Sequence, residues 1–103
     1  MAKFYGVDGS IKEVKPKNGK FFSYEELQSF IKEGDDGMVE IVPLPDGRSI
    51  VVNEEGKLIG LPENENASAV WRKLYPKEKY PHNNDELVVG NALIAREEEF
   101  EQD

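Results

Sequence analysis

The sequence predicts a single α+β domain. We expect a mostly antiparallel sheet of about six strands in the order β-β-α-β-β-β-α-β, with two helices packed on one face. Three observations lead to this prediction. Short β-rich runs are separated by turn residues, two segments repeat apolar residues at helical spacing, and a chain of 103 residues suits one domain.

The first segment is predicted to be a hairpin over residues 4–14. Asp8-Gly9 is a favoured turn pair because both residues tolerate positive φ. The first helix is predicted to begin at Ser23, since Ser23 and Glu26 have the spacing of a capping box. Its apolar side chains recur at helical spacing and form one stripe: Tyr24, Leu27, Phe30 and Ile31. Gly34 is expected to end this helix.

Residues 38–61 are predicted to form a three-strand meander. Three β-rich runs lie within it, at residues 38–44, 48–53 and 57–61. The turns between them contain Gly47 and Gly56 and are short, which is typical of antiparallel neighbours. Pro43 has no backbone N–H to donate to a ladder, so the first of these strands is expected to have a free edge.

The second helix is predicted over residues 66–75, with Asn66 as its N-cap. One apolar face follows the helical period: Ala67, Val70, Trp71 and Leu74. We expect Trp71 to be buried, because an indole removes a large apolar area from water. Pro76 stops the helix, since it can neither donate a backbone hydrogen bond nor fit the helix interior.

Residues 86–95 are predicted to form a central strand, because their apolar side chains point to both faces. The domain is expected to cover residues 1–96. Residues 97–103 are expected to form an acidic, frayed tail, since four of the seven are Glu and one is Asp.

The composition excludes several classes of function. The chain has no cysteine, so it has neither disulfides nor thiolate nucleophiles. A net charge of −8 makes direct nucleic-acid binding unfavourable and suits a protein partner, which could be basic. No apolar run approaches the ~20 residues that span a bilayer, so we expect no membrane contact and a cytoplasmic location.

Motifs for catalysis and metal binding are missing from the sequence. His82 is the only histidine, and no serine lies in a nucleophile elbow. No glycine-rich phosphate loop is present, and Asp35 and Asp36 would repel phosphate. We therefore expect a non-enzymatic protein with no catalytic residue, metal ligand or cofactor. A carboxylate enzyme with unrecognised chemistry stays as the weakest alternative.

Four segments of the chain resemble the family known as domain of unknown function 3846. They read "FSYEELQSFI", "VEIVPL", "IVVNEEGKLIGLPENENAS" and "ELVVGNALI". The resemblance runs from about Gly9 to Ala95. It implies a small domain found in bacteria, their phages and mobile elements, with no established activity. It also implies that the Gly-Leu-Pro-x-Asn segment recurs, which here is Gly60, Leu61, Pro62 and Asn64.

The candidate site is a polar pocket formed by the 60–66 loop and a bulge at Gly90. Its residues are Asn53, Gly60, Leu61, Pro62, Asn64, Asn66, Gly90 and Asn91. Asn91 interrupts an apolar strand, and an unpaired buried amide costs about 1–3 kcal/mol. Asn91 must therefore bind either a backbone edge or a ligand. For Asn53, Asn64 and Asn66 the simpler roles are a turn, loop support and a helix cap.

Three functions follow from these observations. The first is a non-catalytic binding or interaction domain. The second is an acidic mimic of nucleic acid that acts against a host defence or DNA-processing enzyme. It requires a stripe of carboxylates at residues 35, 36, 40, 54, 55, 63 and 65. The third is a small-ligand protein that binds a nucleotide through the 60–66 loop and Asn91. The sequence leaves the oligomeric state open.

Overall fold

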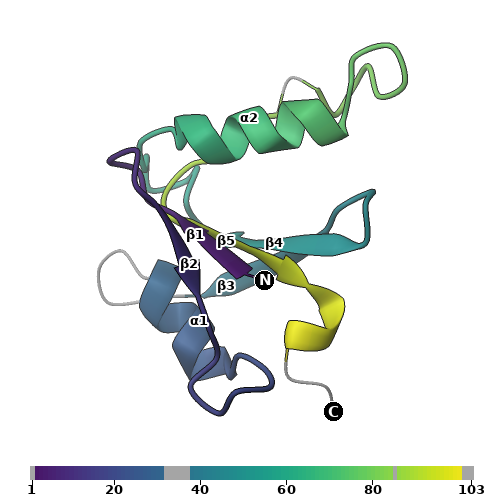
Figure 1. The fold of residues 1–103 in the computed structure, drawn as a ribbon. Helices are drawn as coiled ribbons and strands as arrows, with labels where there is room; N and C mark the ends of the chain where they lie inside the picture. The colour runs from purple at the N-terminus through teal and green to yellow at the C-terminus, as the bar shows by residue number, and fades with distance from the viewer. Residues whose placement is uncertain (1, 32–37, 85, 101–103) are drawn as a thin grey trace.

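The computed structural model describes residues 2–31, 38–84 and 86–100, which fold as an α+β domain. The described strands form one antiparallel sheet in the order β2-β1-β5-β4-β3 (Figure 1). The elements in chain order are β1 (Ala2–Tyr5), β2 (Ile11–Val14), α1 (Tyr24–Ile31), β3 (Val39–Pro43), β4 (Arg48–Asn53), α2 (Glu65–Leu74), β5 (Ala92–Arg96) and a 3₁₀ turn (Glu97–Glu99). The predicted fold class is confirmed, with five strands in the described sheet instead of about six.

Two hairpins supply four of the strands. β1 pairs with β2 through the turn predicted at Asp8-Gly9, where Gly9 has φ 91°. β3 pairs with β4 through the turn that contains Gly47, which has φ 88°. Glycine adopts such positive φ values without the steric cost that other residues bear. Both predicted turns are therefore confirmed.

The last strand, β5, joins the two hairpins into one sheet. It pairs with β1 through Leu93↔Phe4 and with β4 through Ile94↔Ile50. Residues 92–95 are all buried, as expected for a strand covered on both faces. The predicted central position is confirmed, although the strand begins at Ala92 and not at residue 86.

The predicted third strand of the meander, residues 57–61, is a turn. Ile59 N donates to Glu55 O at 3.0 Å, and Leu61 N donates to Gly56 O at 2.9 Å, so the segment coils on itself. β4 already has β3 on one edge and β5 on the other. A third meander strand would need one of those edges, because each strand pairs along only two.

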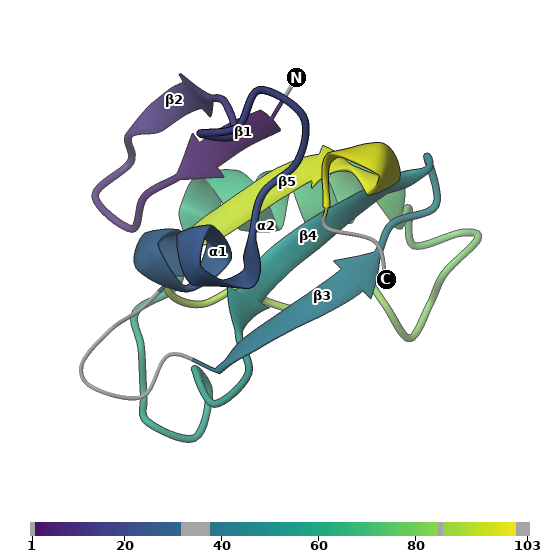
Figure 2. The same cartoon turned by 90° about the horizontal axis from the view of Figure 1, so that it is seen from below.

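The two helices cover opposite faces of the sheet, which corrects the expectation that both pack on one face. Val51 of β4 lies in the apolar cluster beneath α1, whereas its neighbour Ile50 lies in the cluster beneath α2. Figure 1 shows α2 above the sheet and α1 below it, and Figure 2 gives the view from below. β4 and β5 carry apolar side chains on both faces, so each face needs its own cover.

The predicted capping box at the start of α1 is confirmed. Glu26 N donates to Ser23 Oγ at 3.2 Å, and Ser23 N donates to Glu26 Oε1 at 3.3 Å. These two bonds satisfy backbone donors that a helix start leaves free. The predicted helix end at Gly34 and the acidic pair Asp35 and Asp36 lie outside the described residues.

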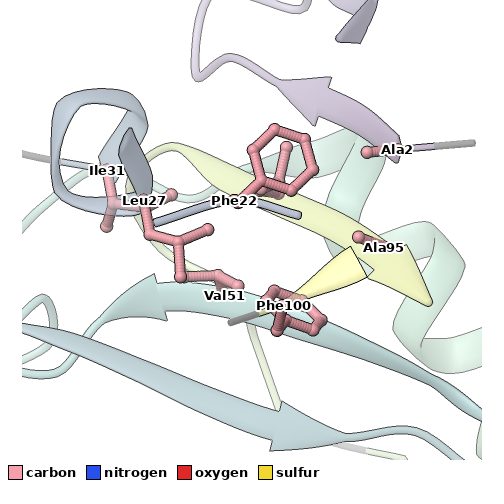
Figure 3. Close-up of a cluster of buried hydrophobic side chains, with 8 residues drawn as sticks. Ala2, Phe22, Leu27, Ile31, Val51, Ala95 and Phe100 are labelled. Carbon is pink, nitrogen blue, oxygen red and sulfur yellow. The ribbon is translucent and has the colours of Figure 1, made fainter. Parts of the chain in front are cut away.

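The core beneath α1 also takes in part of the expected tail (Figure 3). Phe100 is buried in the cluster that contains Phe22 and Leu27. Phe22 N donates to Glu99 O at 2.7 Å, which holds the segment after β5 against the residues that precede α1. Residues 97–100 are therefore part of the packed domain, in contrast to the expected frayed tail, and residues 101–103 lie outside the described chain.

Candidate functional site

Asn64, and not the predicted Asn66, caps the second helix. Its side-chain Oδ1 accepts a hydrogen bond from Ala67 N at 3.1 Å, as an N-cap requires. Asn66 lies inside the first turn of α2, where its Nδ2 donates to Gly9 O at 3.0 Å. The helix consequently begins one residue earlier than predicted, at Glu65.

Asn64 also ties the loop to two other segments. Its Nδ2 donates to Tyr5 O and to Gly90 O, both at 2.9 Å. The residue is 0% exposed, so these bonds form in a dry environment where an unpaired amide would be costly. The two N–H groups of the amide and its oxygen are therefore all bonded within the protein.

The rest of the 60–66 loop packs closely on Gly90. Gly90 N donates to Pro62 O at 2.8 Å, and a Cβ at Gly90 would approach Leu61 Cδ1 to 2.7 Å. Gly90 has φ 74° and Gly60 has φ 72°, which is the left-handed region that favours glycine. The predicted loop and Gly90 therefore meet in space, but apolar and backbone contacts fill the space between them. Gly90 lies in a bend before β5 begins at Ala92, and not in a bulge within a strand.

The other two predicted amides also hold backbone groups. Asn91 Oδ1 accepts from Val7 N at 3.1 Å, as the backbone-edge account of this residue expects. Asn53 Oδ1 accepts from Glu55 N at 2.8 Å and starts the turn after β4. Asn53 Nδ2 is buried and has no hydrogen-bond partner among the described residues. Strand alternation directs this side chain to the α1 face, which it shares with the residue opposite it, Val39.

The structure has a different cavity, of about 180 Å³, on the α2 side of the sheet. Its walls are mainly apolar: Val42, Ile50, Val52, Trp71, Val88 and Val89. β3 and β4 form the floor, α2 supplies Trp71, and the segment before β5 closes one side. Of the eight predicted site residues, Asn53 alone borders this cavity, from the end of β4, although strand alternation directs its side chain to the other face.

Trp71 presents its ring, and not its N–H, to the cavity region. Its indole Nε1 donates to Asn83 O at 2.8 Å, and its ring lies 4.5 Å from that of Tyr75, centroid to centroid. Trp71 is 9% exposed, which confirms the predicted burial. With the N–H already bonded and the ring supported by Tyr75, the indole is a fixed apolar wall.

Charged side chains mark the opening of the cavity. Glu40, Glu54, Lys57 and Glu86 line it and are exposed. Lys57 forms an ion pair with Glu86, which neutralises both side chains. Because the pair is solvent-exposed, its contribution to stability is small. In the part of the chain that the structure describes, no ion pair involves Glu40 or Glu54. Their two negative charges lie beside an apolar cavity, a combination that favours a cationic group.

The carboxyl groups whose pKa departs from the ordinary value lie away from this cavity. Hydrogen bonds from Ser10 lower the pKa of Asp8, and the backbone N–H of Lys17 lowers the pKa of Glu26. Desolvation alone would raise the pKa of Asp46, but hydrogen bonds from Arg48 outweigh it and lower the pKa. Lowered values keep these carboxylates charged at neutral pH, in contrast to the raised pKa of a general acid.

No three metal-ligating side chains cluster anywhere in the described parts of the chain. Within those same residues, the helices are all too short or too polar to cross a bilayer.

No local pattern in the sequence indicates the cavity, because its walls come from segments far apart in the chain. Val42 and Trp71 have the spacing of apolar strand and helix residues, but nothing local shows that they line the same cavity. One signal in the sequence does point to it. Leu58 is 88% exposed and Leu87 is 44% exposed, and both line the cavity from segments expected to be strands. Exposed leucines that flank a hollow are typical of a binding site.

The sheet and its two covering helices define a small α+β domain with an apolar cavity on its α2 face. A family model described as "Domain of unknown function (DUF3846)" matches residues 8–102. The chain belongs to this family, as its resemblance in four segments implies. Searches of curated proteins and of solved structures give no match.

Proposed function

We propose that this protein is a non-catalytic binding domain and that its site is the cavity between β4 and Trp71. The observation that supports the proposal is the cavity itself. It combines apolar walls with two carboxylates at its opening, Glu40 and Glu54, for which no ion pair is found within the described residues. Ligand sites in proteins commonly have this form, with many apolar contacts and a few polar groups that orient the ligand. The proposed site therefore lies in a different part of the fold from the pocket expected at Asn64 and Asn91.

The size and charge of the cavity define the ligand group. An engineered cavity of about 150 Å³ admits benzene, so about 180 Å³ suits one aromatic ring or one branched aliphatic group. The carboxylates of Glu40 and Glu54 favour a positive charge on the same ligand. We infer that the site takes an apolar group with a cation attached close by.

Trp71 provides the test, because it is the only tryptophan in the chain and lines the cavity. Phenethylamine is titrated into the protein while Trp71 fluorescence is recorded. Toluene serves as the neutral analogue and phenylacetate as the anionic analogue. We expect the amine to change the emission in a saturable way and the anion to have at least about tenfold lower affinity. Equal responses to all three compounds would contradict the charge preference.

A cavity-filling variant gives the matched control. Val52→Phe places a larger side chain into the cavity wall and should abolish the response, whereas Val7→Phe adds the same bulk to an exposed hairpin loop and should preserve it. Binding that survives Val52→Phe would place the ligand elsewhere and overturn the proposed site.

The nucleic-acid mimic stays a prediction without a specific observation in its favour. Two of its seven carboxylates, Asp35 and Asp36, lie outside the described residues. Glu40 and Glu54 line the cavity opening, whereas Glu65 begins α2.

A further inference from the structure

The cavity lies directly beside a free edge of the sheet. β3 ends the strand order, and among the described strands it pairs only with β4. Glu40 and Val42 of β3 both line the cavity, and strand alternation puts them on the same face. A strand added to this edge would therefore carry alternate side chains along the cavity opening.

The hydrogen-bond register shows which backbone groups point away from β4. Leu44 N donates to Arg48 O, and Glu54 N donates to Met38 O. In an antiparallel pair the bonded residues alternate, so the even-numbered residues of β3 bond to β4. The N–H and C=O of Val39 and Ile41 consequently face outward.

Pro43 and Tyr75 limit the free edge at the C-terminal end of β3. Pro43 has no N–H, and its carbonyl lies 3.5 Å from Tyr75 Oη. The free edge is thus short and centred on Ile41, whose side chain is 44% exposed.

We propose that β3 accepts an extended segment of another polypeptide, which places an apolar side chain in the cavity and a basic one beside Glu40. This inference rests on the proposed function of the same site. The partner residue opposite Ile41 points to the far face. In the added strand, the residues directly before and after that one point to the cavity face, where they lie beside Val42 and Glu40. Backbone bonds at Ile41 supply affinity, and the cavity and carboxylates supply specificity.

Charge argues for a basic partner over a second copy of this chain. Pairing two β3 strands would bring Glu40 of both copies to one interface, and like charges across neighbouring strands are destabilising. The chain also has a net charge of −8, which repels a second copy and attracts a basic segment.

The test uses the blocked pentapeptide Lys-Thr-Phe-Thr-Lys, whose symmetry allows either strand direction, with Trp71 emission as the readout. The protein variant is Ile41→Pro, which removes the outward N–H without touching the β4 ladder. Its matched control is Ile41→Thr, which changes the side chain and keeps the N–H. The strand already contains one proline whose nitrogen faces away from β4, at Pro43, so we expect it to tolerate another at residue 41. Far-UV circular dichroism verifies that the variant is folded.

We expect the peptide to bind wild type and Ile41→Thr with similar affinity and to bind Ile41→Pro at least about tenfold more weakly. Replacing both Lys by Glu in the peptide should weaken binding by a similar factor, and this arm needs no protein variant. Equal affinity for Ile41→Pro and Ile41→Thr would overturn the added strand.

Two further outcomes separate this inference from the proposed function. If phenethylamine binds and the peptide does not, the cavity is a small-molecule site and only the added strand is overturned. If neither binds, both proposals fall. Sedimentation velocity tests whether a second copy of this chain occupies the edge instead. Self-association of the wild type that Ile41→Pro abolishes would make a second copy the partner and overturn the inference.

Discussion

Asn64 is the residue on which three segments of the fold converge. It is fully buried, and its amide bonds the backbone of β1, of the first turn of α2 and of Gly90. These partners are 59 and 26 residues away along the chain for the two donated bonds. Such a side chain stabilises the native fold mainly because its removal leaves buried backbone groups unpaired.

Replacing Asn64 by Leu should destabilise the protein strongly. The carbonyls of Tyr5 and Gly90 and the N–H of Ala67 would lose their partner, at a total cost of about 3–5 kcal/mol in the free energy of unfolding. Urea denaturation measures it. Asn66→Ala is the control, because its bond to Gly9 is exposed, and it should cost less than about 1 kcal/mol. Similar losses for the two variants would contradict this role for Asn64.

Gly90 and Gly60 allow backbone strain to be separated from close packing. Both have positive φ, so Ala at either position costs about 1 kcal/mol. A Cβ at Gly90 meets Leu61, whereas a Cβ at Gly60 meets nothing within 4 Å. We therefore expect Gly90→Ala to lower the melting temperature more than Gly60→Ala does. Equal shifts would show that Leu61 moves aside without cost.

The choice between Asn64 and Asn66 shows where residue-level prediction stops. Both amides precede the apolar period of α2, and both residue types are good N-caps. Asn64 takes the cap position because Tyr5 O and Gly90 O reach its other side-chain atom, and those partners are distant in the chain. Sequence spacing contains no information about them.

At the scale of single elements, local signals were sufficient for α1 and for both hairpin turns. The capping residues and the turn glycines act within a few residues of themselves, so their effect is visible in the sequence. The predicted strand at residues 57–61 failed for the opposite reason. Its apolar residues suit a strand, but the edge of β4 that it would need is taken by β5.

The capping box of α1 should make stability depend on pH. The N–H of Lys17 and Ser23 bond the Glu26 carboxylate and lower its pKa below the ordinary value of 4.5. A depressed folded pKa adds stability above the unfolded value, and this stability is lost as the pH falls through the folded value. The free energy of unfolding should therefore decrease between about pH 5 and pH 3.

Glu26→Gln should reduce this acid dependence, because the amide keeps a hydrogen-bond acceptor but has no charge to titrate. Denaturant titrations at several pH values measure the slope. Glu25→Gln removes an exposed charge from the same helical turn and serves as the control. An unchanged slope in Glu26→Gln would exclude the capping box as its source.

At the scale of the whole molecule, one sheet connects two apolar clusters. β4 and β5 contribute to both, through Val51 and Leu93 on one face and Ile50 and Ile94 on the other. Loss of packing on the α1 face therefore weakens the strands that support α2. The sequence predicted apolar residues on both sides only for the last strand, and it could not assign a helix to each face, because that depends on how the connections cross the sheet.

We expect the two faces to unfold together. Leu27→Ala leaves a cavity beneath α1 and should cost about 2–5 kcal/mol. Trp71 lies on the opposite face, so its fluorescence and the far-UV circular dichroism should report the same shifted midpoint. Ser29→Ala, at an exposed position of α1, should leave the midpoint nearly unchanged. Separate midpoints in Leu27→Ala would show two independent units.

The strand order has a consequence for synthesis on the ribosome. The strands of the hairpins β1–β2 and β3–β4 are synthesised first, but the hairpins are joined only through β5, which is made after all of them. A nascent chain that stops before Ala92 therefore has two separate ribbons and no common sheet. We expect such a chain to be digested readily by protease while it is tethered, and to become resistant once residues 92–100 have left the exit tunnel.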